Sequence, residues 1–258
     1  MTQFINKKSI KILLRSLLVI LLIYTIAIPV WPMFWANYYS PTKPPANLGI
    51  IYNKSNSGTL TSNPKSIFRS VVIGDSTALG QGTDSVKKSF GYQYLESKKE
   101  LKNQNWSFEN RAISGAKISE VLERQMDFEP VDLVMVSIGA NDVTGNTKPT
   151  DFEKSAINLA NKLKTQAKQV IWLNLPDFVT SPILLPPLNY YLSQKERELN
   201  KILENIVPKA GYQLVDVYNQ AREPYAKEPD LHFGADKYHP SELGYAVWVK
   251  IIQRKLEA

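Results

Sequence analysis

Cysteine is absent from the 258-residue chain, and histidine occurs only twice, as His232 and His239. Without cysteine there is no disulfide, no thiolate metal ligand and no cysteine nucleophile. Two histidines leave little room for a histidine-rich metal centre. Hydrophobic residues make up 43% of the chain and charged residues 21%. These fractions are those of an ordinary globular protein and argue against a disordered or fibrous chain.

Acidic residues are missing from residues 1–65, which contain seven lysines and arginines. These seven equal the formal net charge of +7, so residues 66–258 carry 24 basic and 24 acidic residues and are neutral overall. A nucleic-acid-binding domain is expected to carry a basic patch of its own. The charge distribution therefore argues against nucleic acid as a partner.

Charged residues are also missing from residues 16–42. The apolar part of this run is about 20 residues long, enough to cross the roughly 30 Å hydrocarbon layer of a bilayer as a helix. Because basic residues precede it, we expect residues 1–15 to be a cytoplasmic N-terminus, residues 16–36 a single-pass transmembrane anchor, and all later residues to lie outside the cell membrane. Aromatic residues at the far end favour the headgroup layer, and they are Trp31, Trp35, Tyr38 and Tyr39.

Two other interpretations of this apolar run are a cleaved signal peptide and a buried core helix. A signal peptide has a shorter apolar region and small residues before its cleavage site. Here Phe34 stands three positions before any cut after Ala36. The length and the flanking charges favour the uncleaved anchor.

Residues 37–66 are rich in proline, asparagine, serine and lysine, which predicts an extended linker. Residues 67–258 then alternate short apolar runs with amphipathic stretches. Strands are predicted at 67–73, 106–111, 131–138, 169–175 and 212–217. Helices are predicted at 90–101, 118–126, 151–168, 192–207 and 241–256. Such alternation indicates a parallel sheet with helices on both faces.

Ligands of open parallel sheets bind beyond the carboxyl ends of the strands. The polar residues that follow the predicted strands should therefore meet at one site, and they are 74–76, 110–115, 139–142 and 236–239. Each group has a plain structural interpretation, because Asp, Ser, Asn and Gly are common helix caps and turn residues. A lone histidine is also more often structural than catalytic, and we assign His232, between two apolar neighbours, to the structural class.

Taken together, these residues predict a serine nucleophile. A serine needs a base, a group that orients the base, and donors for the developing oxyanion. His239 supplies a base with a pKa near neutrality, and Asp236 lies three residues before it. The donors would be the amides of Ser76 and Gly115 and the side chain of Asn141, and Gly115 lets the backbone approach closely.

At this point the chain resembles the SGNH (GDSL-type) hydrolases, a family of lipases and acylhydrolases. Four sequence blocks match the family in order, GDSTALGQGT (74–83), NRAISG (110–115), GAND (139–142) and DKYHP (236–240). The signature positions correspond to Ser76, Gly115, Asn141 and His239, with Asp236 at the acid position. The resemblance covers about residues 67–256.

The resemblance implies a flavodoxin-like three-layer α/β/α sandwich with a five-stranded parallel sheet, preceded here by the transmembrane helix. It also implies hydrolysis of a carboxylic ester through an acyl-serine intermediate, without a metal or an organic cofactor. Ser76 would be the nucleophile, His239 the base and Asp236 its orienting acid, and Ser76, Gly115 and Asn141 would form the oxyanion hole. Thr77 departs from the family, in which many members have leucine, and we expect an effect on packing rather than on chemistry.

The apolar segment 177–192 lies at the predicted catalytic end of the sheet. We expect Leu184, Leu185 and Leu188 to form a wall that binds the acyl chain of the substrate, or a surface that touches the membrane. The plain alternative is a loop packed on the core, since an exposed apolar patch of this size is unusual.

Two other functions stay open. An acyltransferase acting on a surface polysaccharide would use the same triad but exclude water. A tethered binding module without activity is disfavoured by the intact set of site residues. The partners we expect are an ester substrate and the membrane, whereas the sequence does not indicate an oligomeric state.

Overall fold

The structure is a computed structural model that describes residues 11–23, 50–53, 67–102 and 104–257. The chain divides into two units, residues 1–40 and 41–258. In the first unit, residues 11–23 are helical. Within the described ranges, no helix is both long enough and apolar enough to cross a membrane. Residues 24–36 of the predicted anchor lie outside these ranges, so the anchor stays a prediction.

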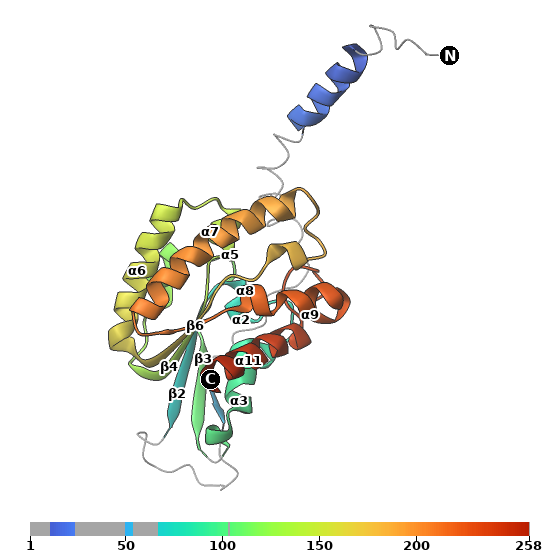
Figure 1. The fold of residues 1–258 in the computed structure, drawn as a ribbon. Coiled ribbons are helices and arrows are strands. Elements are labelled where there is room, and N and C mark those ends of the chain that lie inside the picture. Colours follow the sequence, from blue (N-terminus) through green and yellow to red (C-terminus); the bar gives the residue numbers. More distant parts are fainter. Residues whose placement is uncertain (1–10, 24–49, 54–66, 103, 258) are drawn as a thin grey trace. The chain divides into compact units, whose positions relative to one another are not determined.

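A six-stranded sheet forms the centre of the second unit, with strand order β1-β3-β2-β4-β5-β6 (Figure 1). The strands are β1 (Ile50–Asn53), β2 (Phe68–Gly74), β3 (Trp106–Asn110), β4 (Val131–Ser137), β5 (Ala167–Leu173) and β6 (Gln213–Val215). β2 to β6 are parallel to one another. This confirms the predicted five-stranded parallel sheet, and its strand order is that of flavodoxin-like folds.

β1 is a sixth strand that the sequence analysis did not predict. It pairs with β3 in the antiparallel direction, with Ile50 opposite Glu109 and Asn53 opposite Trp106. Residues 50–53 therefore belong to the sheet and not to an extended linker, and Ile51 packs against the core. The remaining residues of the predicted linker, 37–49 and 54–66, lie outside the described residues.

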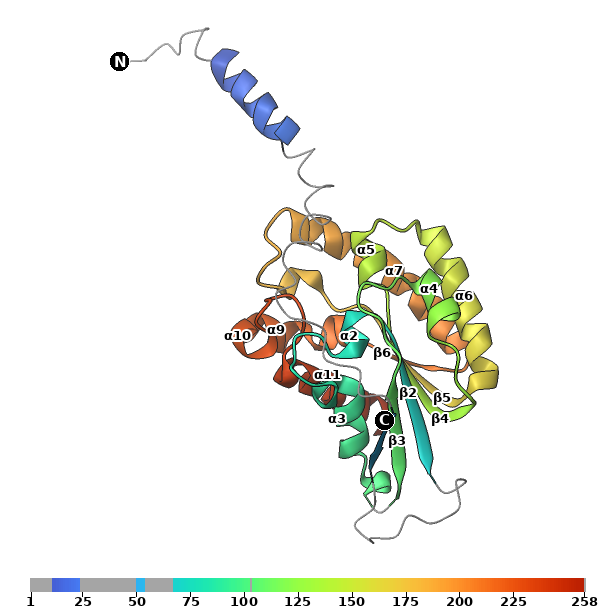
Figure 2. The same cartoon turned by 180° about the vertical axis from the view of Figure 1, so that it is seen from behind.

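Helices cover both faces of the sheet, as Figures 1 and 2 show from opposite sides. The α-helices are α2 (Ser76–Leu79), α3 (Phe90–Ser97), α4 (Ile118–Arg124), α5 (Ala140–Thr144), α6 (Pro149–Gln166), α7 (Leu188–Lys209), α8 (Val217–Gln220), α9 (Arg222–Lys227), α10 (Pro229–His232) and α11 (Glu242–Glu257). Short 3₁₀ turns are η2 (Val86–Lys88), η3 (Lys99–Leu101) and η4 (Phe178–Thr180). α4, α6 and α7 lie over one face, and α3 and α11 lie over the other.

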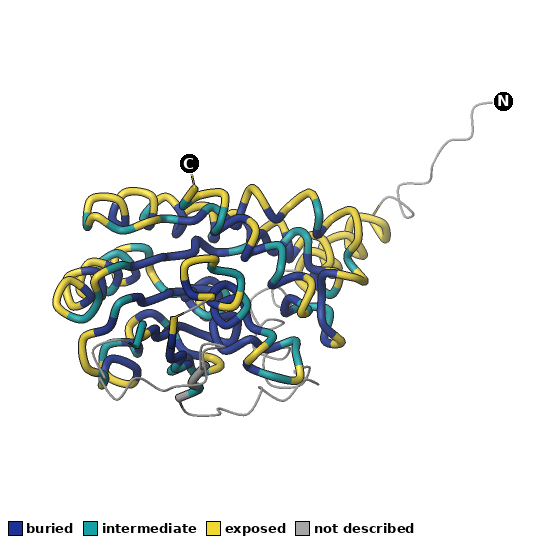
Figure 3. Tube along the Cα trace, turned by 90° about the horizontal axis from the view of Figure 1, so that it is seen from below, coloured by how far each residue is buried: buried dark blue, intermediate teal, exposed yellow. Residues whose placement is uncertain are grey.

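Two hydrophobic clusters fill the space between the layers, and the strands contribute to both because successive side chains point to opposite faces. In β2, Val71 and Ile73 face the cluster under α6 and α7, whereas Val72 faces the cluster under α3 and α11. Figure 3 shows the buried strands between the exposed outer sides of the helices. Burial on both faces explains why the parallel strands are nearly continuous apolar runs.

Element ends differ from prediction by a few residues where the local pattern is ambiguous. β5 spans 167–173 rather than 169–175, and α7 begins at Leu188 rather than at residue 192. In α6, Pro149 occupies the first turn, where its missing N–H costs nothing because that group has no partner inside the helix. The loops that follow β2, β3, β4 and β5 all emerge at one edge of the sheet, which we call the catalytic edge.

Candidate active site

Ser76 begins α2, directly after the tight turn that follows β2. Gly74 ends the strand with a φ of 141°, and a Cβ built there would lie 1.8 Å from the carbonyl oxygen of Ser137 on β4. Glycine is therefore required for the chain to turn against the neighbouring strand. Ser76 is the first residue of α2, so its N–H has no acceptor within the helix and is available to a ligand.

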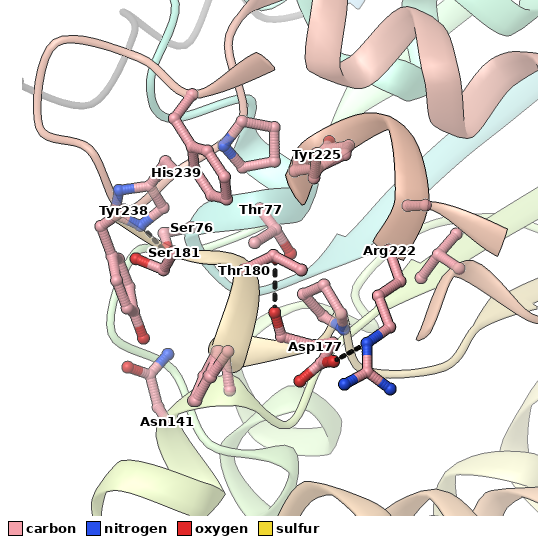
Figure 4. Close-up of a pocket in the computed structure, with 17 residues that line it drawn as sticks. Ser76, Thr77, Asn141, Asp177, Thr180, Ser181, Arg222, Tyr225, Tyr238 and His239 are labelled. Atoms are coloured by element: carbon pink, nitrogen blue, oxygen red, sulfur yellow. Dashed lines mark hydrogen bonds and ion pairs between the residues drawn. The ribbon is translucent and has the colours of Figure 1, made fainter. Parts of the chain in front are cut away.

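His239 and Asp236 complete a hydrogen-bonded chain with Ser76, and Figure 4 shows the part of it that joins Ser76 to His239. The Oγ of Ser76 lies 2.9 Å from Nε2 of His239, and Nδ1 of His239 lies 2.8 Å from Oδ2 of Asp236. The other oxygen of Asp236 accepts the backbone N–H groups of Tyr238 at 3.0 Å and His239 at 2.9 Å. The predicted proximity of these residues, 163 positions apart for Ser76 and His239, is confirmed.

Asp75 joins the loop that carries Ser76 to the loop that carries Asn141. Its Oδ1 accepts hydrogen bonds from the N–H and the hydroxyl of Thr77, and its Oδ2 accepts from the N–H groups of Gly139 and Ala140 at 3.2 and 3.3 Å. Burial raises the pKa of the Asp75 carboxyl above its usual value despite these donors. Asp75 is the N-cap of α2, which is one of the interpretations that the sequence allows, and Asp142 accepts from the N–H of Ile118, so both are buried links between loops.

Asn141 and Gly115 stand in different positions relative to the pocket beside Ser76. Asn141 lines this pocket, and its amide donates one hydrogen bond of 3.1 Å to the carbonyl of Ala116. Gly115 lies in an exposed turn with a φ of 84° and is not among the lining residues. The contact to Ala116 nevertheless ties that turn to Asn141. The oxyanion role of Gly115 therefore stays a prediction, while Ser76 and Asn141 are placed together.

The predicted acyl wall is not where the sequence placed it. Leu184 and Leu188 are buried in the hydrophobic cluster under α6 and α7, and Leu185 is 68% exposed. None of the three lines the pocket. Burial differs between the adjacent Leu184 and Leu185 because the segment turns into α7 here, and neighbouring side chains point to opposite sides. Aromatic and polar groups line the pocket instead, among them Phe178, Thr180, Ser181, Tyr225, Phe233 and Tyr238.

An ion pair in the pocket wall was missed by the sequence analysis. Asp177 is almost fully buried, and its Oδ2 lies 3.1 Å from Nε of Arg222 (Figure 4). Beneath it, burial raises the pKa of Glu196 well above its usual range, which favours the neutral acid. The position of Asp177 just after β5 was a signal that the rule for parallel sheets could have used. Arg222 has no comparable signal, because it belongs to a distant helix.

Thr77 and His232 have structural contacts. The hydroxyl of Thr77 donates to Asp75 and lies 2.7 Å from the hydroxyl of Ser137, so this departure from the family supplies a polar link between loop and strand. The ring of His232 stacks on Tyr225 with 5.4 Å between centroids. Nδ1 of His232 lies 3.0 Å from a backbone carbonyl oxygen. His232 thus packs next to the site without reaching Ser76.

The sequence of this chain also matches a known protein family. The family model of the GDSL-like lipase/acylhydrolases matches residues 72–247, which include all the site residues above. The chain belongs to the GDSL-like lipase/acylhydrolase family, a family of ester-hydrolysing enzymes.

A curated relative of this GDSL-like chain is a GDSL-like esterase of Mycobacterium tuberculosis, which is 26% identical over 182 residues. The match covers 69% of the chain but only 58% of the relative, so the chain spans less than two thirds of that protein's length.

Solved structures share the fold of the GDSL-like chain. An acetylxylan esterase from Geobacillus stearothermophilus superimposes with a TM-score of 0.52 and 18% identity, covering 74% of this chain and 94% of that one. A lipase/acylhydrolase from Enterococcus faecalis gives 0.55 and 19%, covering 74% and 95%. A G-D-S-L lipolytic protein from Veillonella parvula gives 0.55 and 17%, covering 72% and 97%. At such identities the likeness concerns the α/β fold alone.

Proposed function

We propose that the protein is a membrane-anchored serine esterase that cleaves a carboxylic ester through an acyl-serine intermediate. The observation that carries the proposal is the chain of hydrogen bonds from Ser76 through His239 to Asp236, which lies at the side of a pocket at the catalytic edge. A hydroxyl, a base and an orienting carboxylate in this order are the elements of acyl-transfer catalysis.

In the acylation step, Nε2 of His239 takes the proton of the Ser76 hydroxyl while Oγ attacks the carbonyl carbon of the ester. The imidazolium that forms is stabilised by Asp236, whose Oδ2 lies 2.8 Å from Nδ1. Collapse of the tetrahedral intermediate breaks the bond to the alcohol oxygen, which leaves with the proton from Nε2. Water then repeats the sequence on the acyl-serine, releasing the acid and restoring Ser76.

Stabilisation of the tetrahedral oxyanion is assigned to the N–H of Ser76 and the side-chain amide of Asn141. The N–H of Ser76 belongs to the first turn of α2, where the backbone amides have no internal acceptor. Asn141 uses one N–H on Ala116, which orients the amide and leaves its second N–H for the substrate. Each donor of this kind contributes roughly 10² to 10³ in rate.

Membrane anchoring rests on the sequence of residues 16–36 and on the exposed helical residues 11–23. The large aliphatic side chains between residues 12 and 23 are all 53–66% exposed. Residues 17–23 of this helix are apolar on every side, which suits a lipid environment rather than water. The basic residues that precede this segment support a location of the esterase domain on the outer side of the cell membrane.

The test is hydrolysis of p-nitrophenyl acetate and of longer p-nitrophenyl esters by the full chain in detergent micelles. Ser76→Ala should lower turnover at least about 10³-fold. Ser155→Ala, on the outer side of α6, should leave it unchanged and serves as the matched control. Unchanged turnover in Ser76→Ala would overturn the proposal. Release of free acid, rather than transfer to an added sugar, separates the esterase from an acyltransferase.

A further inference from the structure

An uncharged and exposed apolar surface lies next to the pocket, in the loop before α7 and in the first turn of α7. Residues 178–194 form the longest run without a charged side chain in residues 67–258. Within it, Leu185 is 68% exposed, Tyr190 61% and Tyr191 43%. Three prolines of the same segment are also exposed, and they are Pro182, Pro186 and Pro187. We call these six residues the 182–191 surface.

The grouping of these side chains is unusual within the part of the domain that the structure describes. Large exposed apolar side chains beyond residue 53 are Ile157, Leu185, Tyr190, Tyr191, Leu231 and Leu243. Three of these six fall within seven consecutive residues, whereas Ile157 stands in the middle of α6. Single exposed apolar residues are normal in soluble domains, but contiguous ones mark a surface of interaction.

The composition of the 182–191 surface suits the boundary between lipid headgroups and acyl chains. Tyrosine has an apolar ring and a polar hydroxyl, and it is enriched at that depth. Leucine and proline add apolar area without charge. Lys195 places a basic group beside the surface, with its Nζ 5.4 Å from the centre of the Tyr191 ring.

Only a short segment separates the proposed anchor from the first strand of the domain. β1 begins at Ile50, which pairs with Glu109 near the carboxyl end of β3. The chain therefore enters the domain at the catalytic edge. Only residues 37–49 separate Ile50 from the proposed anchor, and thirteen residues reach at most about 45 Å. A domain of this size is roughly 40 Å across, so the tether, even fully extended, reaches only about the width of the domain.

We propose that the 182–191 surface docks on the lipid bilayer in which the chain is anchored and holds the mouth of the pocket at the membrane surface. The inference rests on the proposed anchor but not on the proposed catalysis. Thr180 and Ser181, which immediately precede the surface, line the pocket, and the hydroxyl of Ser181 donates to the carbonyl of Lys237 in the loop of His239. Docking would thus present the pocket to esters carried in the outer leaflet.

Because the chain contains no cysteine, a single introduced cysteine can be labelled at a chosen position, and this allows a direct test. The full chain is reconstituted in zwitterionic phosphatidylcholine vesicles as Leu185→Cys, labelled with an environment-sensitive fluorophore. Ile157→Cys, an exposed aliphatic position on α6, is the matched control. We expect the probe at 185 to shift to the blue and to be quenched by lipids that carry a nitroxide near the headgroup, and the probe at 157 to behave as in water.

Two outcomes overturn the inference. If the protein floats with the vesicles but the probe at 185 reports water, the anchor stands and the docking surface does not. If the protein does not float, both fail. Flotation and probe fluorescence do not depend on turnover. A failure of the proposed esterase activity is therefore recognised separately, from the turnover of the Ser76→Ala variant.

A second variant tests whether docking affects the hydrolysis of esters that are embedded in a bilayer. The triple variant Leu185→Ser, Tyr190→Ser and Tyr191→Ser should hydrolyse p-nitrophenyl acetate within about twofold of the parent. It should lose at least about tenfold in rate on an ester embedded in the vesicles, because the apolar contact area is removed. Ile157→Ser should lose neither. Equal rates of the triple variant and the parent on the embedded ester would contradict the docking.

Discussion

Replacing Asp236 by asparagine should abolish most of the activity without disturbing the fold. In the native site, one carboxylate oxygen accepts the N–H groups of Tyr238 and His239, and the other faces Nδ1 of His239 at 2.8 Å. Asparagine has one oxygen and one NH₂ group, so it can satisfy only one of these two sides as an acceptor.

The backbone decides which side asparagine satisfies. If its oxygen faces the two N–H groups, two hydrogen bonds of about 1 kcal/mol each are kept and the NH₂ group faces Nδ1. If it turns over, its NH₂ group meets two donors and both bonds are lost. The first arrangement is therefore favoured. It obliges Nδ1 of His239 to accept, which puts the proton on Nε2 and prevents this nitrogen from acting as the base toward Ser76.

The expected loss is large because the wrong tautomer predominates. In Ser-His-Asp hydrolases generally, the corresponding change lowers kcat about 10⁴-fold, which corresponds to roughly 5 kcal/mol in the activation free energy. We expect a fall of 10³- to 10⁴-fold in kcat for p-nitrophenyl acetate, with a midpoint of thermal unfolding close to that of the parent.

Asp230→Asn is the matched control for this substitution. Asp230 pairs with Lys237 in the same part of the chain, but its side chain is 92% exposed, so its removal should change the rate less than twofold. A loss below tenfold in Asp236→Asn, in a protein that unfolds at the parental temperature, would refute the argument from the tautomer.

Three other predictions concern the loops around the site. Asn141→Ala should lower kcat/KM about 10²- to 10³-fold, and Asn141→Asp at least as much because a carboxylate repels the oxyanion; an active aspartate variant would remove Asn141 from the oxyanion hole. Burial raises the pKa of Asp142 from 3.8 to about 6, so its stabilising protonated form is fully present below about pH 3.8 and is lost as the pH rises through about 6. Urea unfolding between pH 4 and 7 should therefore show the parent losing up to about 3 kcal/mol relative to Asp142→Asn, and parallel pH profiles would contradict this. Thr77→Val should cost about 1–2 kcal/mol in the same assay, because its hydroxyl bonds Asp75 and Ser137, and a neutral effect would show that the link is dispensable.

Local patterns were sufficient for most of the fold and for the central residues of the site. Residues 131–138 are an almost continuous apolar run, interrupted by Asp132 and Ser137, which predicts a strand buried on both faces, and β4 occupies this place. Because parallel strands end at one edge, the short polar blocks after them had to meet there. The juxtaposition of Ser76 and His239 follows from that topology.

The sequence by itself thus determined the α/β class, the order of the parallel strands along the chain and the meeting of Ser76, His239 and Asp236 at one site, since each depends on short-range periodicity or on a compact motif. Only the tertiary structure decided which side chains form the pocket wall. Leu184 is buried and the adjacent Leu185 is exposed, a difference that periodicity does not resolve where a loop turns into a helix. The ion pair of Asp177 and Arg222 and the pairing of β1 with β3 are likewise contacts between distant segments. Their energy depends on a partner that the local sequence does not specify.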